Sequence, residues 1–398
     1  MPGFKVLIIH SANELFGADL VLLRVVDTLQ PAGWQLTVLL PNDLPYQGEL
    51  ERELQKRNCP VRVMPLGILR RKYLSPWKLP GYSWQLFRAV GAVRRLIKTE
   101  GIELVYSATS AVWCGALAAL RAGRPHVWHL HEIVQKPRWF SRLLAAALNR
   151  WADRVIAVSR PVRDFWTGVQ PALANKLVVI HNGLDLPFYD QPRDRPADRA
   201  ALGIAKDEVL IGCLGRIGSW KGQEFLLDAL AQLRSRHPEL KFKCLLGGGG
   251  IPGQDQARAD LEARIRQLGL GPLTVFKPFS PDVRPWLNAL DVMAVPSLRP
   301  DPFPTVLLEA MAARLPVVAT NHGGPTEMVV PGETGFLVEP GDVPGLAAAL
   351  RTLILDPALR ARQGTAGRLR LEREYSLARF QESIRRLFSA CLSLAAEV

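Results

Sequence analysis

The sequence predicts an α/β protein made of two doubly wound domains that face each other across a deep cleft. Short apolar runs alternate with segments of helical periodicity, which is typical of parallel sheets with helical crossovers. This alternation stops at a polar, proline-rich segment, residues 190–198, and then starts again, so we interpret that segment as an interdomain linker. The length of 398 residues also accommodates two domains of ordinary size.

The first predicted domain covers residues 1–188 and would lie on the acceptor side of the cleft. Helical patterns separate most of its apolar runs, so the strands should be joined by crossovers into a parallel, Rossmann-like sheet. The predicted strands cover 5–10, 35–40, 61–64, 103–106, 126–130, 154–158 and 177–180. The predicted helices cover 17–30, 84–98, 112–121 and 139–151.

The second predicted domain, also Rossmann-like, covers residues 189–375. Its predicted strands cover 209–214, 242–246, 274–279, 292–295 and 317–319, and its predicted helices cover 225–236, 258–268, 305–313 and 346–355. A third segment, 376–398, holds a last helix at about 377–394 that the sequence allows to return to the first domain. Open parallel sheets bind ligands at the carboxyl ends of their strands, so the cleft is the expected site.

The composition indicates a protein of the cytoplasm. Five scattered cysteines without a CxxC pair argue against a disulfide framework and a zinc site, and we interpret them as small buried side chains. No run of about 18 apolar residues is present, so the chain is expected to be soluble or peripheral on the cytoplasmic face of a membrane.

The net charge of +13 is concentrated in the first half of the chain. Residues 1–190 hold 24 Lys and Arg against 14 Asp and Glu, a surplus of ten. Cations and aromatic residues mix in 70–78 and 136–142, and Trp84, Arg88, Arg94, Arg95 and Lys98 follow on a helical pattern. We interpret this as docking on an anionic membrane or a lipid-phosphate acceptor. A solvated face is the alternative, and no nucleic-acid-binding module is recognisable.

Several nucleotide chemistries are excluded by missing motifs. The turn after the first strand holds one glycine, Gly17, so it lacks a dinucleotide fingerprint. Gly248, Gly250 and Gly253 follow a later strand in GxGxxG spacing, but Pro252 removes an amide that a phosphate loop would use. These glycines are expected either to let a nucleotide base approach the backbone or to form a turn. A P-loop, an HExxH helix and the Asp-x-Asp of a metal-bridged diphosphate are all absent.

The most informative stretch runs from residue 296 to 327. A strand ends at Val295, a proline-rich loop follows, and a helix begins near Thr305, whose free amides would hold a sugar diphosphate. Asp301 precedes these amides, and its alternative role is to cap the loop. Glu309 lies about one turn inside the helix among apolar neighbours, where a carboxylate without partners is costly, so we predict a functional role for it.

This stretch resembles the E-x7-E motif of the retaining glycosyltransferases of family 4, bacterial-type group 1 enzymes with the two-domain GT-B fold. The resemblance continues in order along nearly the whole chain. It includes residues 17–19, 155–159, 182–185, 215–216 with 221–222, 322–324, 327 and 334–335. Three residues depart from the family pattern: Asp301 replaces the usual Glu, Pro304 replaces Gly, and Arg314 replaces the Gly after the helix. The first two put the identity of the donor in doubt.

The resemblance implies a role for each matching residue. Arg216 and Lys221 would hold the diphosphate of the donor and stabilise its charge, and Glu309 would bind the nucleotide ribose. Asp301 would bind sugar hydroxyls, aided by amides in the segment Phe303, Pro304, Thr305 and Val306. Gly17 would let the first domain approach the phosphates. His131 is similar to a cleft histidine that would contact the donor sugar, with a structural histidine as the alternative.

The expected activity is metal-independent, retaining transfer of a hexosyl-type sugar from a UDP or GDP donor to a glycan or lipid-linked acceptor. This chemistry suits cell-surface polysaccharide or glycolipid synthesis. It needs no cofactor beyond the nucleotide-diphosphate sugar, which is a co-substrate. An epimerase of nucleotide sugars on the same fold and a catalytically inactive sugar-nucleotide-binding protein are the two alternatives.

Overall fold

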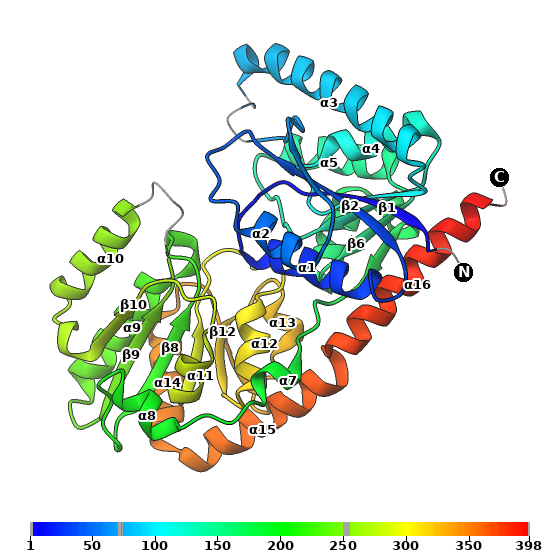
Figure 1. The fold of residues 1–398 in the computed structure, drawn as a ribbon. Helices are drawn as coiled ribbons and strands as arrows, with labels where there is room; N and C mark the ends of the chain where they lie inside the picture. The colour runs from blue at the N-terminus through cyan, green and yellow to red at the C-terminus, as the bar shows by residue number, and fades with distance from the viewer. Residues whose placement is uncertain (1–2, 71–72, 74, 250–254, 397–398) are drawn as a thin grey trace. The chain divides into compact units, whose positions relative to one another are not determined.

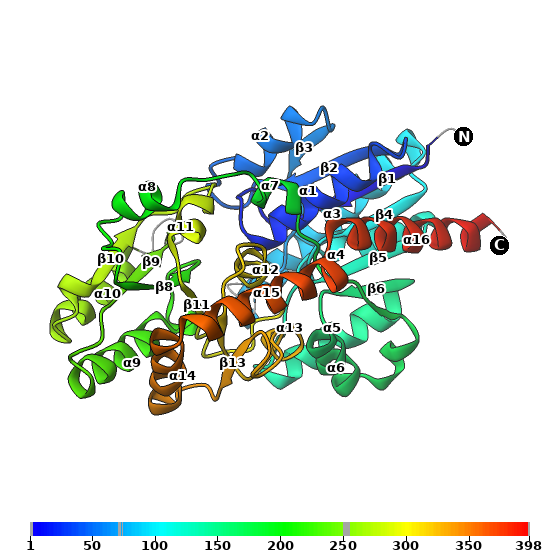
Figure 2. The ribbon, with the colours of Figure 1, turned by 90° about the horizontal axis from the view of Figure 1, so that it is seen from below.

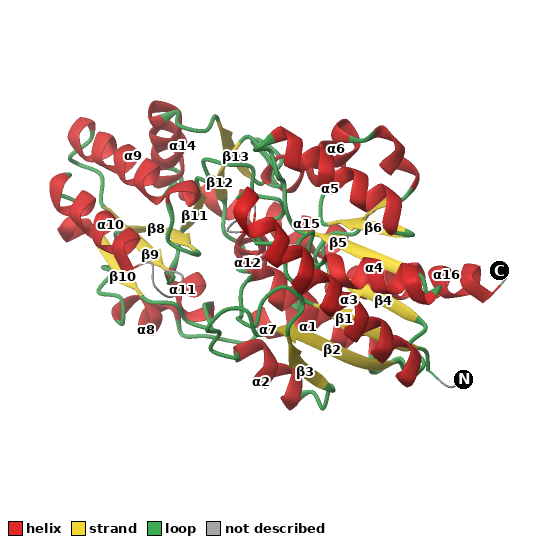
Figure 3. Ribbon diagram, turned by 90° about the horizontal axis from the view of Figure 1, so that it is seen from above, coloured by secondary structure: helices red, strands yellow, loops and turns green. Residues whose placement is uncertain are grey.

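The computed structural model describes residues 3–70, 73, 75–249 and 255–396. The chain divides into two compact units (Figure 1). Unit 1 comprises Met1–Asn182 together with Ala378–Val398, and unit 2 comprises Gly183–Leu377. Each unit is built on one parallel sheet with helices on both of its faces (Figure 3). These are the two parallel α/β sheets that the sequence predicts.

The sheet of unit 1 has seven strands in the order β3-β2-β1-β4-β5-β6-β7. The strands are β1 (Lys5–Ile9), β2 (Gln35–Pro41), β3 (Val61–Met64), β4 (Leu104–Ser107), β5 (His126–Leu130), β6 (Arg154–Ala157) and β7 (Leu177–Val179). The helices are α1 (Gly17–Leu29), α2 (Glu49–Lys56), η2 (Pro76–Lys78), α3 (Leu79–Glu100), α4 (Trp113–Ala122), α5 (Arg138–Trp151), α6 (Arg160–Val169), η3 (Pro171–Asn175) and α16 (Leu377–Ala396).

The central strands of unit 1 are apolar on both faces because helices cover both. Leu7 and Ile9 of β1 pack in one cluster with α3 and α4. Helix α16 crosses the opposite face (Figure 2). Its Phe388 is fully buried, with the ring 5.5 Å from that of Tyr106 in β4 and 6.1 Å from that of Trp34. The last helix of the chain thereby completes the core of unit 1.

The sheet of unit 2 has six strands in the order β10-β9-β8-β11-β12-β13. The strands are β8 (Val209–Leu214), β9 (Phe242–Gly247), β10 (Thr274–Lys277), β11 (Val292–Val295), β12 (Val317–Thr320) and β13 (Gly335–Val338). The helices are α7 (Leu186–Tyr189), α8 (Arg195–Ala200), η4 (Ser219–Lys221), α9 (Gln223–Arg236), α10 (Asp255–Gln267), η5 (Gly271–Leu273), α11 (Arg284–Ala289), α12 (Thr305–Ala312), α13 (Pro325–Met328), α14 (Val343–Leu355) and α15 (Pro357–Glu374).

The strand order reverses once in each sheet, and these reversals position the candidate site. In unit 1 the chain leaves β1 for β2 on one side, whereas β4 lies on the other side. In unit 2 the same reversal lies between β8 and β11. Loops that leave two such strands diverge, and the space between them is where open α/β sheets bind ligands.

One sequence interpretation is wrong. Residues 190–198, interpreted as a linker between domains, lie within unit 2, and α8 begins inside this segment. The Asp194 side chain caps that helix, and Asp190 is held by Arg368 at 2.7 Å. Prolines and charges at the first turn of a short helix produce the same composition as a linker.

The prediction for the cysteines is confirmed. The five cysteines are all buried and free, as predicted. Among the described helices, none is both long enough and apolar enough to span a bilayer. Gly250 and Gly253 of the GxGxxG spacing lie outside the described residues.

Candidate functional site

Two loops of unit 2 meet where its strand order reverses. The first follows β8 and leads through η4 into α9, and the second runs from β11 to α12. The Leu298 amide donates to the Trp220 carbonyl at 2.7 Å, which fastens the two loops together. Gly222 has φ of +76°, and a Cβ there would lie 1.9 Å from the Pro296 carbonyl oxygen. This close approach requires glycine and fixes the position of the preceding residue, Lys221.

The two loops bring Lys221 and Asp301 into contact, although 80 residues separate them. The Lys221 Nζ lies 2.6 Å from Asp301 Oδ2, and the side chains are 20 % and 8 % exposed. Ser297 Oγ is 3.5 Å from the same carboxylate oxygen. The ammonium also lies 4.3 Å from the centre of the Trp220 ring, within cation–π range. Asp301 is therefore neutralised by the cation that the sequence assigns to the diphosphate.

The loop after β12 is hydrogen-bonded to the backbone of the Asp301 loop. The Gly324 amide donates to the Asp301 carbonyl at 2.7 Å, and a Cβ on Gly323 would lie 2.5 Å from that oxygen. His322 Nε2 donates to the Ser297 carbonyl at 2.7 Å. Asp301 is thus held by its backbone as well as by its ion pair, so its carboxylate has a defined position.

The start of α12 lies directly after this loop. Pro304 is the N-cap residue and supplies no side-chain capping bond, so the first amides, at Thr305 and Val306, have no partner within the helix. Phe303 is buried, and its ring lies 5.5 Å from that of Tyr375. Glu309 is half-buried in the second turn, between the buried Leu308 and Ala310. This helix start can accept an anion, as the sequence predicts for a sugar diphosphate.

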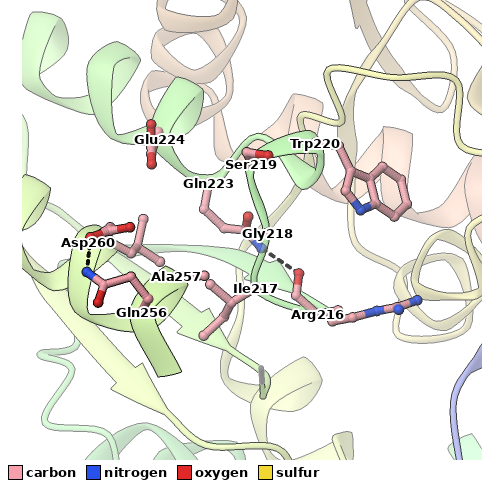
Figure 4. A pocket seen from close by; sticks show the side chains of 11 residues that line it. Arg216, Ile217, Gly218, Ser219, Trp220, Gln223, Glu224, Gln256, Ala257 and Asp260 are labelled. Atoms are coloured by element: carbon pink, nitrogen blue, oxygen red, sulfur yellow. Dashed lines mark hydrogen bonds between the residues drawn. The ribbon is translucent and has the colours of Figure 1, made fainter. Parts of the chain in front are cut away.

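A cavity of about 580 Å³ lies beside the first of these loops. Arg216 alone of the predicted site residues lines it, and its carbonyl accepts a bond from Gln223 Nε2 at 3.0 Å. Gln256 and Asp260 line the opposite side of the cavity, and in Figure 4 the Arg216 side chain extends in the direction away from them. The guanidinium is therefore not directed into this cavity. The other lining residues are Ile217, Gly218, Ser219, Trp220, Glu224, Ala257 and Leu261.

In unit 1, the loop after β1 is fastened by a pair that the sequence did not reveal. His10 Nε2 lies 2.5 Å from Asp19 Oδ1, and both side chains are almost fully buried. Asp19 Oδ2 accepts from the Phe16 amide at 2.7 Å. Gly17 follows Phe16 and is exposed, and a Cβ on it would contact no described atom within 4 Å. The fold itself does not require this glycine, so the space beside it is open to a ligand.

His131 follows β5 in the same unit. Its ring lies 4.2 Å from that of His129, whose Nδ1 is 2.6 Å from the Tyr106 hydroxyl. Within the part of the chain that is described, His131 Nε2 has no hydrogen-bond partner. Burial, together with the nearby His10, lowers the pKa of His131 to about 3. His131 is therefore a neutral imidazole that can exchange a hydrogen bond with a ligand.

Sequence reasoning did not identify His10 or Ser297 as residues of the candidate site. It also did not predict that Asp19 would bind both His10 and the Phe16 amide in the loop before Gly17. A histidine at a strand end and an aspartate three residues after a helix N-cap are common, so neither pattern identifies a pair. In residues 3–70, 73, 75–249 and 255–396, no cluster of three or more His, Cys, Asp or Glu side chains is arranged to hold a metal ion.

Comparison with known proteins matches both units to one family. The profile "Glycosyltransferase Family 4" matches residues 17–188, and "Glycosyl transferases group 1" matches residues 194–370. The D-inositol 3-phosphate glycosyltransferase of Streptomyces avermitilis is 32% identical over 63% of this chain and 57% of its own length. The alpha-maltose-1-phosphate synthase of Mycolicibacterium smegmatis is 31% identical over 67% of this chain and 73% of its own length.

A solved structure resembles the whole chain. The Anabaena protein Alr3699/HepE, crystallised with UDP and glucose, superposes with a TM-score of 0.82 at 28% identity over 97% of this chain and 99% of its own. The chain spans little more than half the length of the first two curated relatives, 57% and 51%. Both halves of the chain nevertheless match in order, and the chain belongs to the group 1, family 4 glycosyltransferases.

Proposed function

We propose that the protein is a retaining, metal-independent glycosyltransferase that moves a sugar from a nucleotide-diphosphate donor to a glycan or lipid-linked acceptor. The observation that carries the proposal is the Lys221–Asp301 pair beside the start of α12. The relative crystallised with UDP and glucose makes UDP-glucose the first donor to test. A cytoplasmic role in cell-surface polysaccharide or glycolipid synthesis is part of this proposal.

The proposed donor binding depends on Lys221 exchanging its present partner, the Asp301 carboxylate, for the diphosphate of the donor. A donor diphosphate competes with Asp301 for the ammonium, and its remaining charge is met by Arg216 and the amides of Thr305 and Val306. The Asp301 carboxylate then becomes available to accept hydrogen bonds from sugar hydroxyls, while Glu309 binds the ribose. For unit 1 the proposal keeps the roles that the family resemblance implies for Gly17 and for the neutral His131, contact with a phosphate and a hydrogen bond to a sugar.

The transfer step balances without a metal or a base from the protein. The acceptor hydroxyl attacks the anomeric carbon on the face from which the diphosphate departs, so configuration is retained. The bond from that carbon to the phosphate oxygen breaks as the new glycosidic bond forms. The hydroxyl proton passes to the departing diphosphate, and nucleoside diphosphate is released. The protein contributes positioning and stabilisation of negative charge.

The test is a panel of UDP and GDP sugars incubated with acceptors and analysed by product mass spectrometry. We expect one donor to yield free nucleoside diphosphate and a product heavier by one sugar. A changed sugar with no acceptor present would instead identify an epimerase, and donor binding without turnover would identify an inactive binding protein. Because the chain lacks an Asp-x-Asp motif, EDTA should leave the rate unchanged. Loss of activity in EDTA with recovery on adding a divalent ion would refute metal independence.

A further inference from the structure

Helix α3 has one buried face and one face that the structure leaves in solvent. Tyr82, Ala89, Val93 and neighbouring residues are buried, and most of this stripe packs against the sheet. The opposite face carries exposed residues at helical spacing: Trp84, Phe87, Arg88, Gly91, Arg95 and Lys98. These residues recur every three, four or seven positions, so they line one side of a helix of 22 residues.

Two aromatic rings on this face are largely exposed. The Trp84 and Phe87 side chains are each 62 % exposed, and their rings stack with centroids 6.0 Å apart and planes 22° apart. Trp77, just before the helix, is 93 % exposed. Large rings that stack on each other in solvent form an exposed apolar surface, and such surfaces often mark a site of interaction with a partner or a membrane.

The charge around these rings has a single sign. No Asp or Glu occurs between Glu53 and Glu100, whereas this interval contains eleven Lys and Arg residues. Glu100 at the end of α3 is paired with Arg62. Within the described part of the chain, Arg88, Arg95 and Lys98 take part in no ion pair, so their charges face solvent.

Two other cations near this face, Arg70 and Arg94, bind groups within unit 1, so we leave them out of the candidate surface. Arg70, which the sequence places in the docking segment, is bonded to Asp43 at 3.0 Å and to the Ser11 carbonyl at 2.7 Å, and it is 22 % exposed. Arg94 donates to the Arg121 carbonyl at 3.2 Å. Arg71 and Lys72 lie outside the described residues. The candidate surface therefore consists of the exposed side of α3 and Trp77. We call it the α3 face, and its residues are Trp77, Trp84, Phe87, Arg88, Gly91, Arg95 and Lys98.

Helix α5 repeats the pattern in the same layer of unit 1. Trp139, Arg142, Leu143, Ala146 and Arg150 are exposed at the same spacing, with Trp139 at 56 %. No acidic residue occurs between Glu132 and Asp153. Helix α4 lies between α3 and α5 and contacts both. Two helices of one layer thus present rings and cations to solvent without a carboxylate among them.

We propose that the α3 face docks on the surface of an anionic phospholipid bilayer. Tryptophan and phenylalanine rings favour the boundary between headgroups and acyl chains, and the long stems of Arg and Lys place their charges at the headgroup phosphates. The exposed residues of α3 lie along one side of the helix, so the rings can enter the boundary while Arg88, Arg95 and Lys98 meet phosphates. The absence of carboxylates removes the repulsion that an anionic surface would otherwise meet.

The test is co-sedimentation of the full chain with vesicles of phosphatidylcholine alone or mixed with phosphatidylglycerol. Neither donor nor acceptor is present, so the result is independent of the proposed transferase activity. We expect binding to the mixed vesicles that weakens as salt is raised. Each engaged cation contributes about 1 kcal/mol, or about fivefold in the partition coefficient. The triple variant Arg88→Gln, Arg95→Gln, Lys98→Gln should therefore lose about a hundredfold.

A matched variant separates this surface from net charge. Lys206→Gln, Arg236→Gln and Arg351→Gln remove three exposed cations of unit 2 and lower the net charge by the same three units, from +13 to +10. This control should bind vesicles like the parent chain. Trp84→Ser with Phe87→Ser should also lose binding, whereas Phe279→Ser, an exposed ring of unit 2, should not.

Three results would overturn the proposal. The first is equal binding to neutral and mixed vesicles, and the second is equal loss in the α3 and unit 2 triple variants. The third is displacement of the chain from mixed vesicles by an equimolar amount of double-stranded DNA, which would identify the α3 face as a nucleic-acid surface. Circular dichroism of each variant checks that the exposed substitutions leave the fold intact.

Discussion

Replacing Asp301 with Asn tests the central claim that Lys221 exchanges the carboxylate for a donor diphosphate. The Lys221–Asp301 contact is 2.6 Å long, and the carboxylate is 8 % exposed. Removing one partner of a buried ion pair costs about 3–5 kcal/mol, and we expect roughly 2–3 kcal/mol because Lys221 keeps a fifth of its exposure. Native-state hydrogen exchange of the β8 and β11 amides measures this loss within unit 2 alone.

The same substitution should tighten the binding of UDP. Under the proposed exchange, a diphosphate displaces the Asp301 carboxylate from Lys221 in the parent chain, whereas in the Asn variant the ammonium has no carboxylate partner at this position. We expect about a tenfold lower dissociation constant, equivalent to about 1.4 kcal/mol. Lys221→Met should weaken UDP binding by ten- to a hundredfold, since a charge-assisted contact contributes about 1.5–3 kcal/mol. Isothermal titration calorimetry measures both changes.

Unit 2 offers a matched control for this experiment. Lys241 and Asp207 form an ion pair of the same length, 2.6 Å, but their side chains are 67 % and 60 % exposed. Asp207→Asn should leave both hydrogen exchange and UDP affinity unchanged, because exposed pairs contribute little. If Asp301→Asn and Lys221→Met both bind UDP like the parent chain, Lys221 is not a phosphate ligand and the proposed exchange is wrong.

Three further substitutions test other parts of the structure. Glu309→Gln should raise the donor dissociation constant at least tenfold through a lost charge-assisted bond, with the exposed Glu333→Gln as control; equal affinities would make Glu309 structural. Gly222→Ala should destabilise unit 2 by at least about 2 kcal/mol, because its φ is +76° and its Cβ would meet the Pro296 carbonyl at 1.9 Å. Gly218→Ala, at an extended φ of 174°, should not destabilise unit 2. Equal amide hydrogen-exchange rates in the two variants would contradict the predicted clash at Gly222. Burial lowers the pKa of His126 from 6.5 to about 3, so the unfolded chain binds an extra proton between these values. The stabilising contribution is full above pH 6.5 and is lost as the pH falls toward 3, by up to about 1.4 kcal/mol per pH unit. Urea unfolding of parent and His126→Gln between pH 7 and 5 should show the flatter curve in the variant, and parallel curves would reject the assignment.

Periodicity alone predicted the strands that carry the site, and it failed at elements that depend on close backbone approach. The strands β5, β8 and β11 have the predicted bounds, because buried parallel strands are continuous apolar runs. Strand β13 was missed because it begins at Gly335, which sequence reasoning takes as a turn. A Cβ there would lie 2.0 Å from the Val317 carbonyl oxygen, so the strand needs that glycine to pair with β12.

Helix α15 was missed for a related reason. Its 18 residues bury Gln363, Gly364, Gly367 and Arg368 beside two leucines, so its buried face is not an apolar stripe. Gly364 would place a Cβ 1.9 Å from the Arg314 carbonyl oxygen, and Arg368 binds the Ala312 carbonyl at 3.2 Å. A helix held by close backbone approach and by ion pairs leaves little hydrophobic periodicity to detect.

The contact between Lys221 and Asp301 in the candidate site could not be predicted from sequence motifs either. Sequence motifs identified Lys221 and Asp301 separately and gave them different parts of the donor, a diphosphate and a sugar. Their contact depends on the strand order, because β8 and β11 are neighbours only through the reversal of the sheet. The pair also gives a physical meaning to the departure from Glu at position 301. The Gly324 amide holds the Asp301 backbone carbonyl, while the carboxylate contacts Lys221 and Ser297. With the backbone fixed, a side chain longer by one methylene would move its carboxylate away from these two contacts. Asp301, one of the three residues that depart from the family pattern, is therefore also the residue that Lys221 would release under the proposed function.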